Sequence, residues 1–358
     1  MDSPYLSRLA RGIEPYVPGE QPTSDGLIKL NTNENPYPPS PRVEEALRGR
    51  AARLRLYPEI DARTLREIIA RREGLSPEQV FVGNGSDEVL SFCSPAFFDP
   101  EEPVRFPAVT YSFYRVYAKL FGIPYEEVPM LPGFAVDVQG MTAGRGGAIL
   151  PNPNAPTSLE LPLAVIEDMA RAQREKGRVL VVDEAYVAFG QEPSAATLVP
   201  RYDNLLVTRT LSKAHALAGL RVGYALGQRG LIEGLLRVKD SFNSYPVDSL
   251  AIAAAAAALQ DEDYFRLRRD QVVRTRDFFR QGLLERGFAV LPSSANFVFA
   301  RPNFCPGREL FAALRRRNVL VRRWDAPGIE EYLRISIGTQ EEMEKVLAIL
   351  DEIRASSV

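Results

Sequence analysis

Short apolar runs alternate with longer stretches of helical periodicity between residues 75 and 210. The short runs carry almost no polar residue, as expected for strands buried on both faces of a parallel sheet. The longer stretches place apolar residues every three or four positions, which is typical of helices that cover such a sheet. The pattern therefore predicts an α/β fold with a mainly parallel central sheet in a large domain. The predicted strands are 80–82, 102–106, 147–150, 179–182 and 204–208, and the predicted helices are 43–53, 63–73, a segment ending at residue 97, 111–121 and 163–175.

Both ends of the chain follow other patterns. The first 42 residues are rich in Pro, Gly, Asn and Tyr, which favours an extended arm with turns rather than a helix. After residue 250, long helices come before several short strands, which indicates a smaller α+β domain. We therefore expect an N-terminal arm over 1–42 that packs with the small domain, a large domain over 43–250 and a small domain over 251–358. The predicted C-terminal elements are helices 250–259, 264–286, 308–317 and one ending at 353, with strands 288–291, 296–300, 319–322 and 332–337.

Composition excludes several classes of function. The 358 residues carry a net charge of −2, which argues against a nucleic-acid partner because such proteins usually have a basic excess. One histidine and two distant cysteines do not make a His-based metal site, a Ser/His triad or a disulfide framework. The longest apolar run, 251–259, is too short for a membrane span and predicts a buried helix. Since the N-terminus lacks the pattern of a signal peptide, we expect a cytoplasmic protein without a membrane partner.

Polar side chains recur just after the ends of the predicted strands, where open α/β sheets bind ligands. The segment 83–87 (Gly-Asn-Gly-Ser-Asp) opens a helix, and its amides and hydroxyl can hold a phosphate. Asp183 ends an apolar strand, where a carboxylate is costly without a partner, and Tyr186 follows it. Tyr111 and Lys213 follow two other strands. A tight turn, a surface lysine or a packing residue explains each group singly, so the prediction of a site depends on their combination.

The segment around Lys213 indicates which chemistry these groups share. Lys213 lies among small and apolar residues, with Ser212 before it and Arg221 after it. Apolar surroundings or a nearby cation lower the pKa of a lysine and make its amine a nucleophile. A lysine, a carboxylate, a phenol, an aromatic face and phosphate donors together suit pyridoxal 5′-phosphate, because the lysine can form a Schiff base and the carboxylate can pair with the pyridine nitrogen.

Motifs along nearly the full chain resemble those of the fold-type-I pyridoxal-phosphate aminotransferases, and most closely those of the histidinol-phosphate aminotransferases. They follow one another in the family's order. The Asp-Glu-Ala-Tyr and Ser-Lys-Ala motifs are specific for the superfamily and less so for the substrate. The matching segments are 30–34 (LNTNE), 57–59 (YPE), 85–88 (GSDE), 181–186 (VVDEAY), 209–214 (RTLSKA), 217–223 (LAGLRVG) and 333–339 (LRISIGT).

This resemblance implies a role for each matching residue. Lys213 would form the Schiff base and move the proton of the substrate, Asp183 would keep the pyridine nitrogen protonated, and Tyr186 would bond the 3′ oxygen of the cofactor. Tyr111 would stack on the ring, and Tyr57 would reach the cofactor phosphate of the other subunit in a homodimer with shared sites. The cofactor phosphate would be held by Ser86, Asp87, Thr210, Ser212 and Arg221.

The substrate residues also follow from the resemblance. Arg334 and Arg322 would together bind the phosphate of the amino donor, since two arginines suit a doubly charged group. Tyr16 in the arm would close over the substrate, and Arg323 is equally well explained as a solvated residue. The implied reaction is transamination between histidinol phosphate and 2-oxoglutarate in histidine biosynthesis. An aromatic aminotransferase, a decarboxylase of threonine phosphate and a non-enzymatic regulatory module remain alternatives.

One position departs from the family pattern. Where the family has Asn-Asn-Pro-Thr-Gly, with the second Asn on the 3′ oxygen of the cofactor, this chain has Asn154-Ala155 followed by Pro-Thr-Ser158. Ala155 cannot make that bond, so either Asn154 replaces it or Tyr186 makes the contact alone. His215 follows Lys213 closely, but we expect it to pack rather than act as a base.

Overall fold

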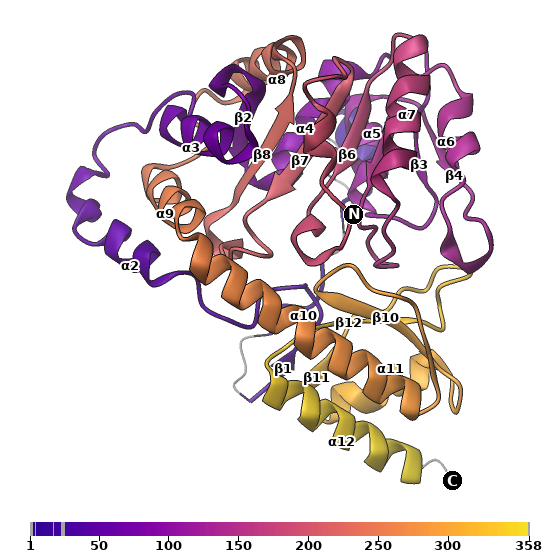
Figure 1. Ribbon diagram of the computed structural model, residues 1–358. Helices are drawn as coiled ribbons and strands as arrows, with labels where there is room; N and C mark the ends of the chain where they lie inside the picture. Colours follow the sequence, from indigo (N-terminus) through magenta and orange to yellow (C-terminus); the bar gives the residue numbers. More distant parts are fainter. Residues whose placement is uncertain (1–2, 4, 17, 23–25, 357–358) are drawn as a thin grey trace.

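The computed structural model describes residues 3, 5–16, 18–22 and 26–356. It contains a layered part around a seven-stranded sheet and a smaller part that lies against one end of it (Figure 1). In the described part of the chain, no helix has the length and the apolar run that crossing a membrane requires.

The large sheet has the strand order β2-β8-β7-β6-β5-β3-β4. The neighbours β4, β3, β5, β6 and β7 run parallel, whereas β8 is antiparallel to both β7 and β2. The prediction of an α/β fold with a mainly parallel sheet is confirmed, but the predicted strands lacked β4 and β8. The strands are β2 Val80–Asn84, β3 Val104–Pro107, β4 Tyr125–Val128, β5 Ala148–Pro151, β6 Leu180–Asp183, β7 Leu205–Thr210 and β8 Val222–Gly227.

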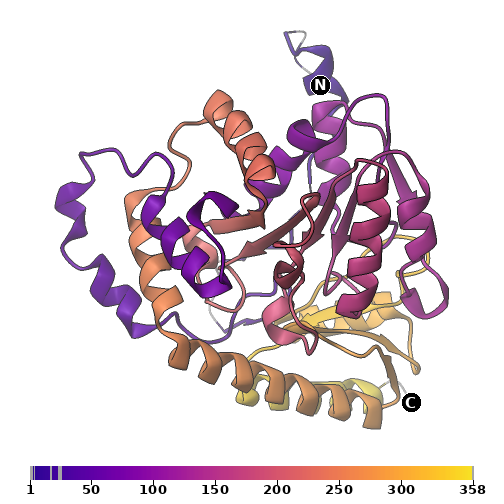
Figure 2. The same ribbon diagram turned by 45° about the horizontal axis from the view of Figure 1, so that its top comes forward.

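Helices cover both faces of this sheet (Figure 2). Consecutive residues of β6 face opposite sides, so Val181 belongs to one apolar cluster, while Leu180 and Val182 belong to another. Because both faces are buried, the strand has to be apolar throughout, which is why its sequence shows no alternation. Helices α4 Gly85–Phe97, α5 Phe113–Phe121 and α8 Arg229–Phe242 pack on the first face, and α3 Arg63–Glu73, α6 Val138–Ala143, α7 Leu163–Glu175 and α9 Ser249–Gln260 pack on the second.

The smaller part combines C-terminal elements with the arm. Its three-stranded antiparallel sheet, β12-β10-β9, packs with three helices around a third apolar cluster. The arm strand β1 Ile28–Lys29 pairs in parallel with β11 Val319–Leu320, which fixes the arm to this part of the molecule. The other elements are α10 Glu262–Glu285, β9 Phe288–Val290, β10 Phe297–Pro302, α11 Gly307–Arg316, β12 Leu333–Ser336 and α12 Gln340–Ser356.

The short helices differ in part from the prediction, and one of them lies in the arm, whose composition predicted no helix. Helix α1 Arg8–Gly12 is a single exposed turn started by the Ser7 side chain, and it buries no residue. Helix α2 Pro41–Leu47 begins two residues before the predicted helix and ends early, because Arg48 is extended and Gly49 is left-handed before a separate 3₁₀ turn, η1 Arg50–Arg53. The remaining 3₁₀ turns are η2 Pro77–Gln79, η3 Pro132–Phe134, η4 Val187–Phe189, η5 Ala195–Leu198 and η6 Ala218–Leu220.

Candidate active site

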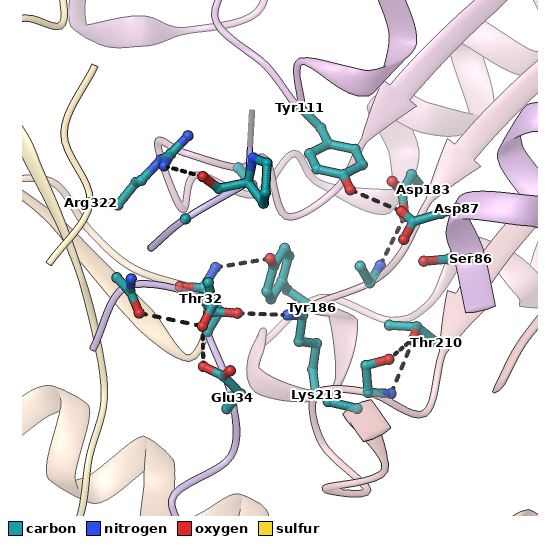
Figure 3. A pocket seen from close by; sticks show the side chains of 18 of the residues that line it. Thr32, Glu34, Ser86, Asp87, Tyr111, Asp183, Tyr186, Thr210, Lys213 and Arg322 are labelled. Atoms are coloured by element: carbon teal, nitrogen blue, oxygen red, sulfur yellow. Dashed lines mark hydrogen bonds between the residues drawn. The ribbon is translucent and has the colours of Figure 1, made fainter. Parts of the chain in front are cut away.

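A cavity of about 440 Å³ lies where the carboxyl ends of β5, β6 and β7 meet the arm and the smaller part. Pro151, Asp183 and Thr210, the last residues of these three strands, all line it. Thr32 and Glu34 of the arm and Arg322 of the smaller part lie on the opposite side (Figure 3), and Arg334 lines the cavity as well. The volume is in the range of sites that bind cofactors and small substrates.

Lys213 lies three residues after the end of β7 and points into this cavity (Figure 3). Its Nζ donates a hydrogen bond to the backbone carbonyl of Thr32 in the arm at 3.0 Å. Burial, and next the positive charge of Arg334, lower the pKa of Lys213 from 10.5 to about 8. The amine is therefore partly neutral near physiological pH, which nucleophilic attack requires.

Asp183 ends β6 as a nearly buried carboxylate. It accepts hydrogen bonds from the hydroxyl of Tyr114 at 2.7 Å and from the amide of Ala185 at 3.2 Å. Burial raises the pKa of Asp183 to about 6, although the Tyr114 bond opposes the rise. No lysine or arginine in the described part of the chain forms an ion pair with it. A cationic ring nitrogen is the kind of partner that this carboxylate lacks.

The start of α4 forms an anion-binding corner with two other segments. Gly85 has a φ of +79°, and a Cβ there would lie 2.6 Å from Nη2 of Arg221, so glycine lets the guanidinium approach the helix start. Arg221 donates to Oδ2 of Asp87 at 3.0 Å, and the hydroxyls of Thr210 and Ser212 lie 2.9 Å apart beside it. Amides at a helix start, hydroxyls and a guanidinium together suit a phosphate.

Two tyrosines border the space between this corner and Lys213. The Tyr111 hydroxyl donates to Oδ1 of Asp87 at 2.9 Å, and burial together with Asp87 raises the pKa of Tyr111. Tyr186, from the segment after β6, accepts a hydrogen bond from Nδ2 of Asn33 at 2.9 Å. Tyr16 packs edge-on to Tyr111 with ring centroids 6.2 Å apart and lines the same cavity.

Arg322 and Arg334 lie at the other end of the cavity. Their backbones pair in an antiparallel bridge, with N to O distances of 3.0 and 2.8 Å. Arg322 donates to the carbonyl of Pro18 at 3.1 Å, and Arg334 donates to the carbonyl of Asn31 at 2.9 Å. Two guanidiniums are thus held on one wall by contacts with the arm.

Four residues that the sequence analysis discussed for the site do not line the cavity: Asn154, Tyr57, His215 and Arg323. Asn154 is buried, and its amide bonds the carbonyl of Val109 at 3.0 Å and the Thr157 hydroxyl at 2.9 Å, so it is Ala155 that lines the cavity. Tyr57 is 82% exposed and stacks on Tyr245.

His215 stacks on the ring of Phe265 with centroids 4.6 Å apart, away from Lys213 Nζ and its cavity. Arg323 binds Asp325 at 2.6 Å and the carbonyl of Glu330 at 2.7 Å, so its guanidinium faces away from the neighbouring Arg322 site. Neither His215 nor Arg323 is among the described residues that line the cavity.

Tyr114, Thr32 and Asn33 form hydrogen bonds with predicted site residues, but no role was predicted for them. Tyr114 is the second residue of α5 and follows Tyr111, which precedes the helix, by three positions; this closeness in sequence is the signal that could have placed Tyr114 at the site. Thr32 contributes only a backbone carbonyl, for which its side chain gives no signal. Its hydroxyl bonds both Lys29 and Glu34, which holds the turn that presents the carbonyl.

The residues present fit pyridoxal 5′-phosphate by their chemistry. A partly neutral lysine, a buried carboxylate without a cation, a phenol and an anion-binding corner surround one cavity. With Ala155 in the wall, Tyr186 is the side chain available for the 3′ oxygen. In the described part of the chain, no group of three or more His, Cys, Asp or Glu side chains is arranged to hold a metal ion.

Comparison with known proteins gives one family. The family model for class I and II aminotransferases matches residues 25–350. Histidinol-phosphate aminotransferase 1 of Methylococcus capsulatus is 52% identical over 99% of this chain and 98% of the relative, and the protein of the same name from Bradyrhizobium diazoefficiens is 52% identical over 98% and 99%. The structure of histidinol-phosphate aminotransferase from Sinorhizobium meliloti in complex with pyridoxal-5′-phosphate covers 100% of this chain and 99% of its own, with a TM-score of 0.89 and 25% identity.

Proposed function

The chain belongs to the class I and II aminotransferase family, and we propose that it transfers the amino group of histidinol phosphate to 2-oxoglutarate with pyridoxal phosphate as cofactor. The observation that carries the choice of substrate is the pair Arg322 and Arg334 on the wall of the cavity that also holds Lys213. Two guanidiniums suit the double negative charge of a phosphate ester, whereas a single guanidinium would be enough to bind a carboxylate. The products are imidazole-acetol phosphate and glutamate, which assigns the enzyme to histidine biosynthesis.

In this proposal the side chains hold the cofactor through its phosphate, its ring nitrogen, its 3′ oxygen and one face of its ring. The start of α4 with Ser86 and Asp87, together with Thr210, Ser212 and Arg221, binds its phosphate. Asp183 binds the protonated ring nitrogen, which supplies the cation that the carboxylate lacks in the protein alone. Tyr186 donates to the 3′ oxygen, and Tyr111 covers one face of the ring. Bound pyridoxal phosphate supplies an electron-withdrawing ring that weakens the bonds at the α-carbon of the substrate.

Lys213 is then the group that moves the proton. Its pKa of about 8 lies close to physiological pH, so the amine can accept a proton from the α-carbon and return it. Tyr16 and the carbonyls of the arm close the cavity beside the arginines and restrict the access of water to the reacting carbon. Asn154 is left without a role at the cofactor, because its amide holds the turn around Thr157 instead.

Direct tests use the purified protein. It should be yellow as isolated, and Lys213→Ala should abolish turnover while the fold is retained. The amino donor is identified by kcat/KM for histidinol phosphate, phenylalanine and threonine phosphate, each with 2-oxoglutarate. A preference for phenylalanine, or release of CO₂ from threonine phosphate without glutamate formation, would overturn the proposed substrate. Arg322→Ala should reduce kcat/KM for histidinol phosphate more than for phenylalanine.

We also propose a homodimer in which Tyr57 completes the site of the other subunit. Its 82% exposed side chain stacks on Tyr245, and further apolar side chains are exposed in the 54–60 loop and at the end of α8, as is typical of surfaces that bind another protein. These further side chains are Leu54, Leu56, Ile60 and Phe242.

Mixing two inactive variants tests this arrangement. A Lys213→Ala subunit combined with a Tyr57→Ala subunit would form one site in which both residues are intact, so activity should reappear on mixing. Equal activity of the mixture and of the separate variants, with subunit exchange verified by labelled chains, would mean that Tyr57 does not act across the subunits.

A further inference from the structure

The only tryptophan of the chain, Trp324, contacts both arginines of the cavity wall. The guanidinium carbon of Arg322 lies 5.5 Å from the centre of the Trp324 ring, and that of Arg334 lies 5.3 Å from it. Trp324 does not itself line the cavity among the described residues, so it lies behind the two arginines rather than beside a bound ligand. A cation over an indole face is attracted by the electrons of the ring.

The backbone explains why these three side chains meet. Arg322 and Arg334 exchange both of their N–H···O bonds, so they lie directly opposite each other and project from the same face. Side chains alternate along an extended segment, which returns Trp324 to the face of Arg322 and sends Arg323 to the other. The contacts of Arg323 with Asp325 and Glu330 agree with this alternation.

Directly opposed like charges destabilise an antiparallel pair. No carboxylate of the described residues forms an ion pair with Arg334, and its buried Nε has no hydrogen-bond partner there. Its other contacts are the carbonyl of Asn31 and the ring of Phe297, whose centre is 5.4 Å away. The aromatic face of Trp324 is therefore the contact that the two guanidiniums share.

We propose that Trp324 is a positioning residue that holds Arg322 and Arg334 side by side, spaced so that both bind the phosphate of the amino donor. This inference rests on the proposed function. The ring keeps the two guanidiniums together before the substrate arrives. The phosphate dianion therefore binds a preorganised pair, and less side-chain entropy is lost on binding. Because the ring touches both guanidiniums, their binding of a phosphate changes its surroundings.

The first test separates the aromatic face from simple packing. Trp324→Phe keeps a ring, whereas Trp324→Leu fills space without one. For Trp324→Leu we expect the KM for histidinol phosphate to rise about five- to thirtyfold, as loss of two cation–π contacts implies, while kcat stays within about threefold. Trp324→Phe should recover most of the KM. Tyr332→Leu is the matched control, since it removes an aromatic contact with Arg301 at 5.9 Å outside the cavity, and its KM should not change.

The second test uses the fluorescence of the single tryptophan and does not depend on turnover. Inorganic phosphate is titrated into the cofactor-loaded protein while tryptophan emission and inhibition of the enzyme are recorded. We expect a saturable change in emission with the same midpoint as the inhibition, and its loss in Arg322→Ala. This readout also serves if Trp324→Leu fails to fold.

The outcomes are distinct. If phosphate inhibits but emission stays constant, or if Trp324→Leu keeps the wild-type KM, Trp324 does not position the pair, while the proposed function stands. If the wild-type enzyme does not use histidinol phosphate, the proposed function fails, and the phosphate titration still shows whether Trp324 and the arginines form an anion site. A KM that rises equally in Trp324→Phe and Trp324→Leu would show that packing, rather than the aromatic face, matters.

Discussion

Asn33 in the arm donates a hydrogen bond from Nδ2 to the hydroxyl of Tyr186 at 2.9 Å. The orientation of the side-chain amide follows from its other contact, since Oδ1 accepts from the Ser336 hydroxyl at 2.8 Å, and that hydroxyl in turn accepts from the backbone N–H of Asn33 at 2.9 Å. An amide nitrogen only donates, so the Tyr186 oxygen accepts here and its own proton is free for the cavity. Asn33 thus fixes the direction in which Tyr186 donates.

This contact predicts different effects for two substitutions of Asn33. Asn33→Ala removes a donor, and we expect turnover to fall about tenfold, as for loss of one hydrogen bond in a buried site. Asn33→Asp should be more harmful, because the carboxylate accepts the Tyr186 proton and withdraws it from the cofactor. The pH dependence of the absorbance of the bound cofactor distinguishes the two. If both variants give the wild-type curve, Asn33 does not control the Tyr186 proton.

The lowered pKa of Lys213 predicts how capture of the cofactor depends on pH. Only the neutral amine attacks the aldehyde, and its fraction falls about tenfold per pH unit below a pKa of about 8. The rate at which cofactor-free protein takes up pyridoxal phosphate should therefore rise with pH and level off above about 8, measured by stopped-flow absorbance. Arg334→Met removes a cation that lowers this pKa, so the midpoint should move to higher pH. A midpoint near the ordinary 10.5 in the wild type would contradict the prediction.

His215 should make stability depend on pH. Both ring nitrogens are buried without a hydrogen-bond partner among the described residues. Burial, with Arg72 and Arg209 nearby, lowers the pKa of His215 from 6.5 to about 3. Between pH 6.5 and 3 the histidine is protonated in the unfolded chain but stays neutral in the folded one. The contribution of His215 to the free energy of unfolding is therefore complete above pH 6.5 and is lost as the pH falls from 6.5 toward 3.

Urea unfolding across that range measures the effect. His215→Phe should keep the stacking on Phe265 and reduce the slope of the unfolding free energy by about 1.4 kcal/mol per pH unit. Turnover should change little, since His215 lies outside the cavity. An unchanged slope in His215→Phe would show that other groups cause the acid sensitivity.

A buried ion network beside the site predicts a large loss of stability. Arg209 pairs with Glu73 at 2.7 Å and with Glu184 at 3.0 Å, and the Glu184 side chain is 1% exposed. Arg209→Leu leaves a buried carboxylate uncompensated, so the free energy of unfolding should fall by about 3–5 kcal/mol in urea titrations. Arg229→Ala, which removes an exposed pair with Glu233, is the control and should have no measurable effect. Equal stability of the two variants would mean that the network is relaxed or hydrated.

Local patterns determined the kind of fold and the kind of chemistry. The apolar run before Asp183 predicted a central strand, because a strand whose two faces are both buried is apolar at successive positions. Lys213, Asp183 and the glycine-rich start of α4 suggested a cofactor site by residue type. The strand β8, Val222–Gly227, was not predicted, since Gly223 and Gly227 interrupt its apolar pattern, and its antiparallel direction depends on its neighbours.

Which groups meet in space was decided by tertiary structure alone. The backbone carbonyl of Thr32 accepts a hydrogen bond from Lys213, which is 181 positions away in the sequence. Every residue has a backbone carbonyl, so the residue type does not indicate which one takes part in a site. Asn154 and Ala155 are adjacent, yet the folded turn directs only Ala155 to the cavity. Arg322, Trp324 and Arg334 become one cluster because two strand segments pair in a single register, and a shift by one residue would have turned Arg323 toward the substrate instead.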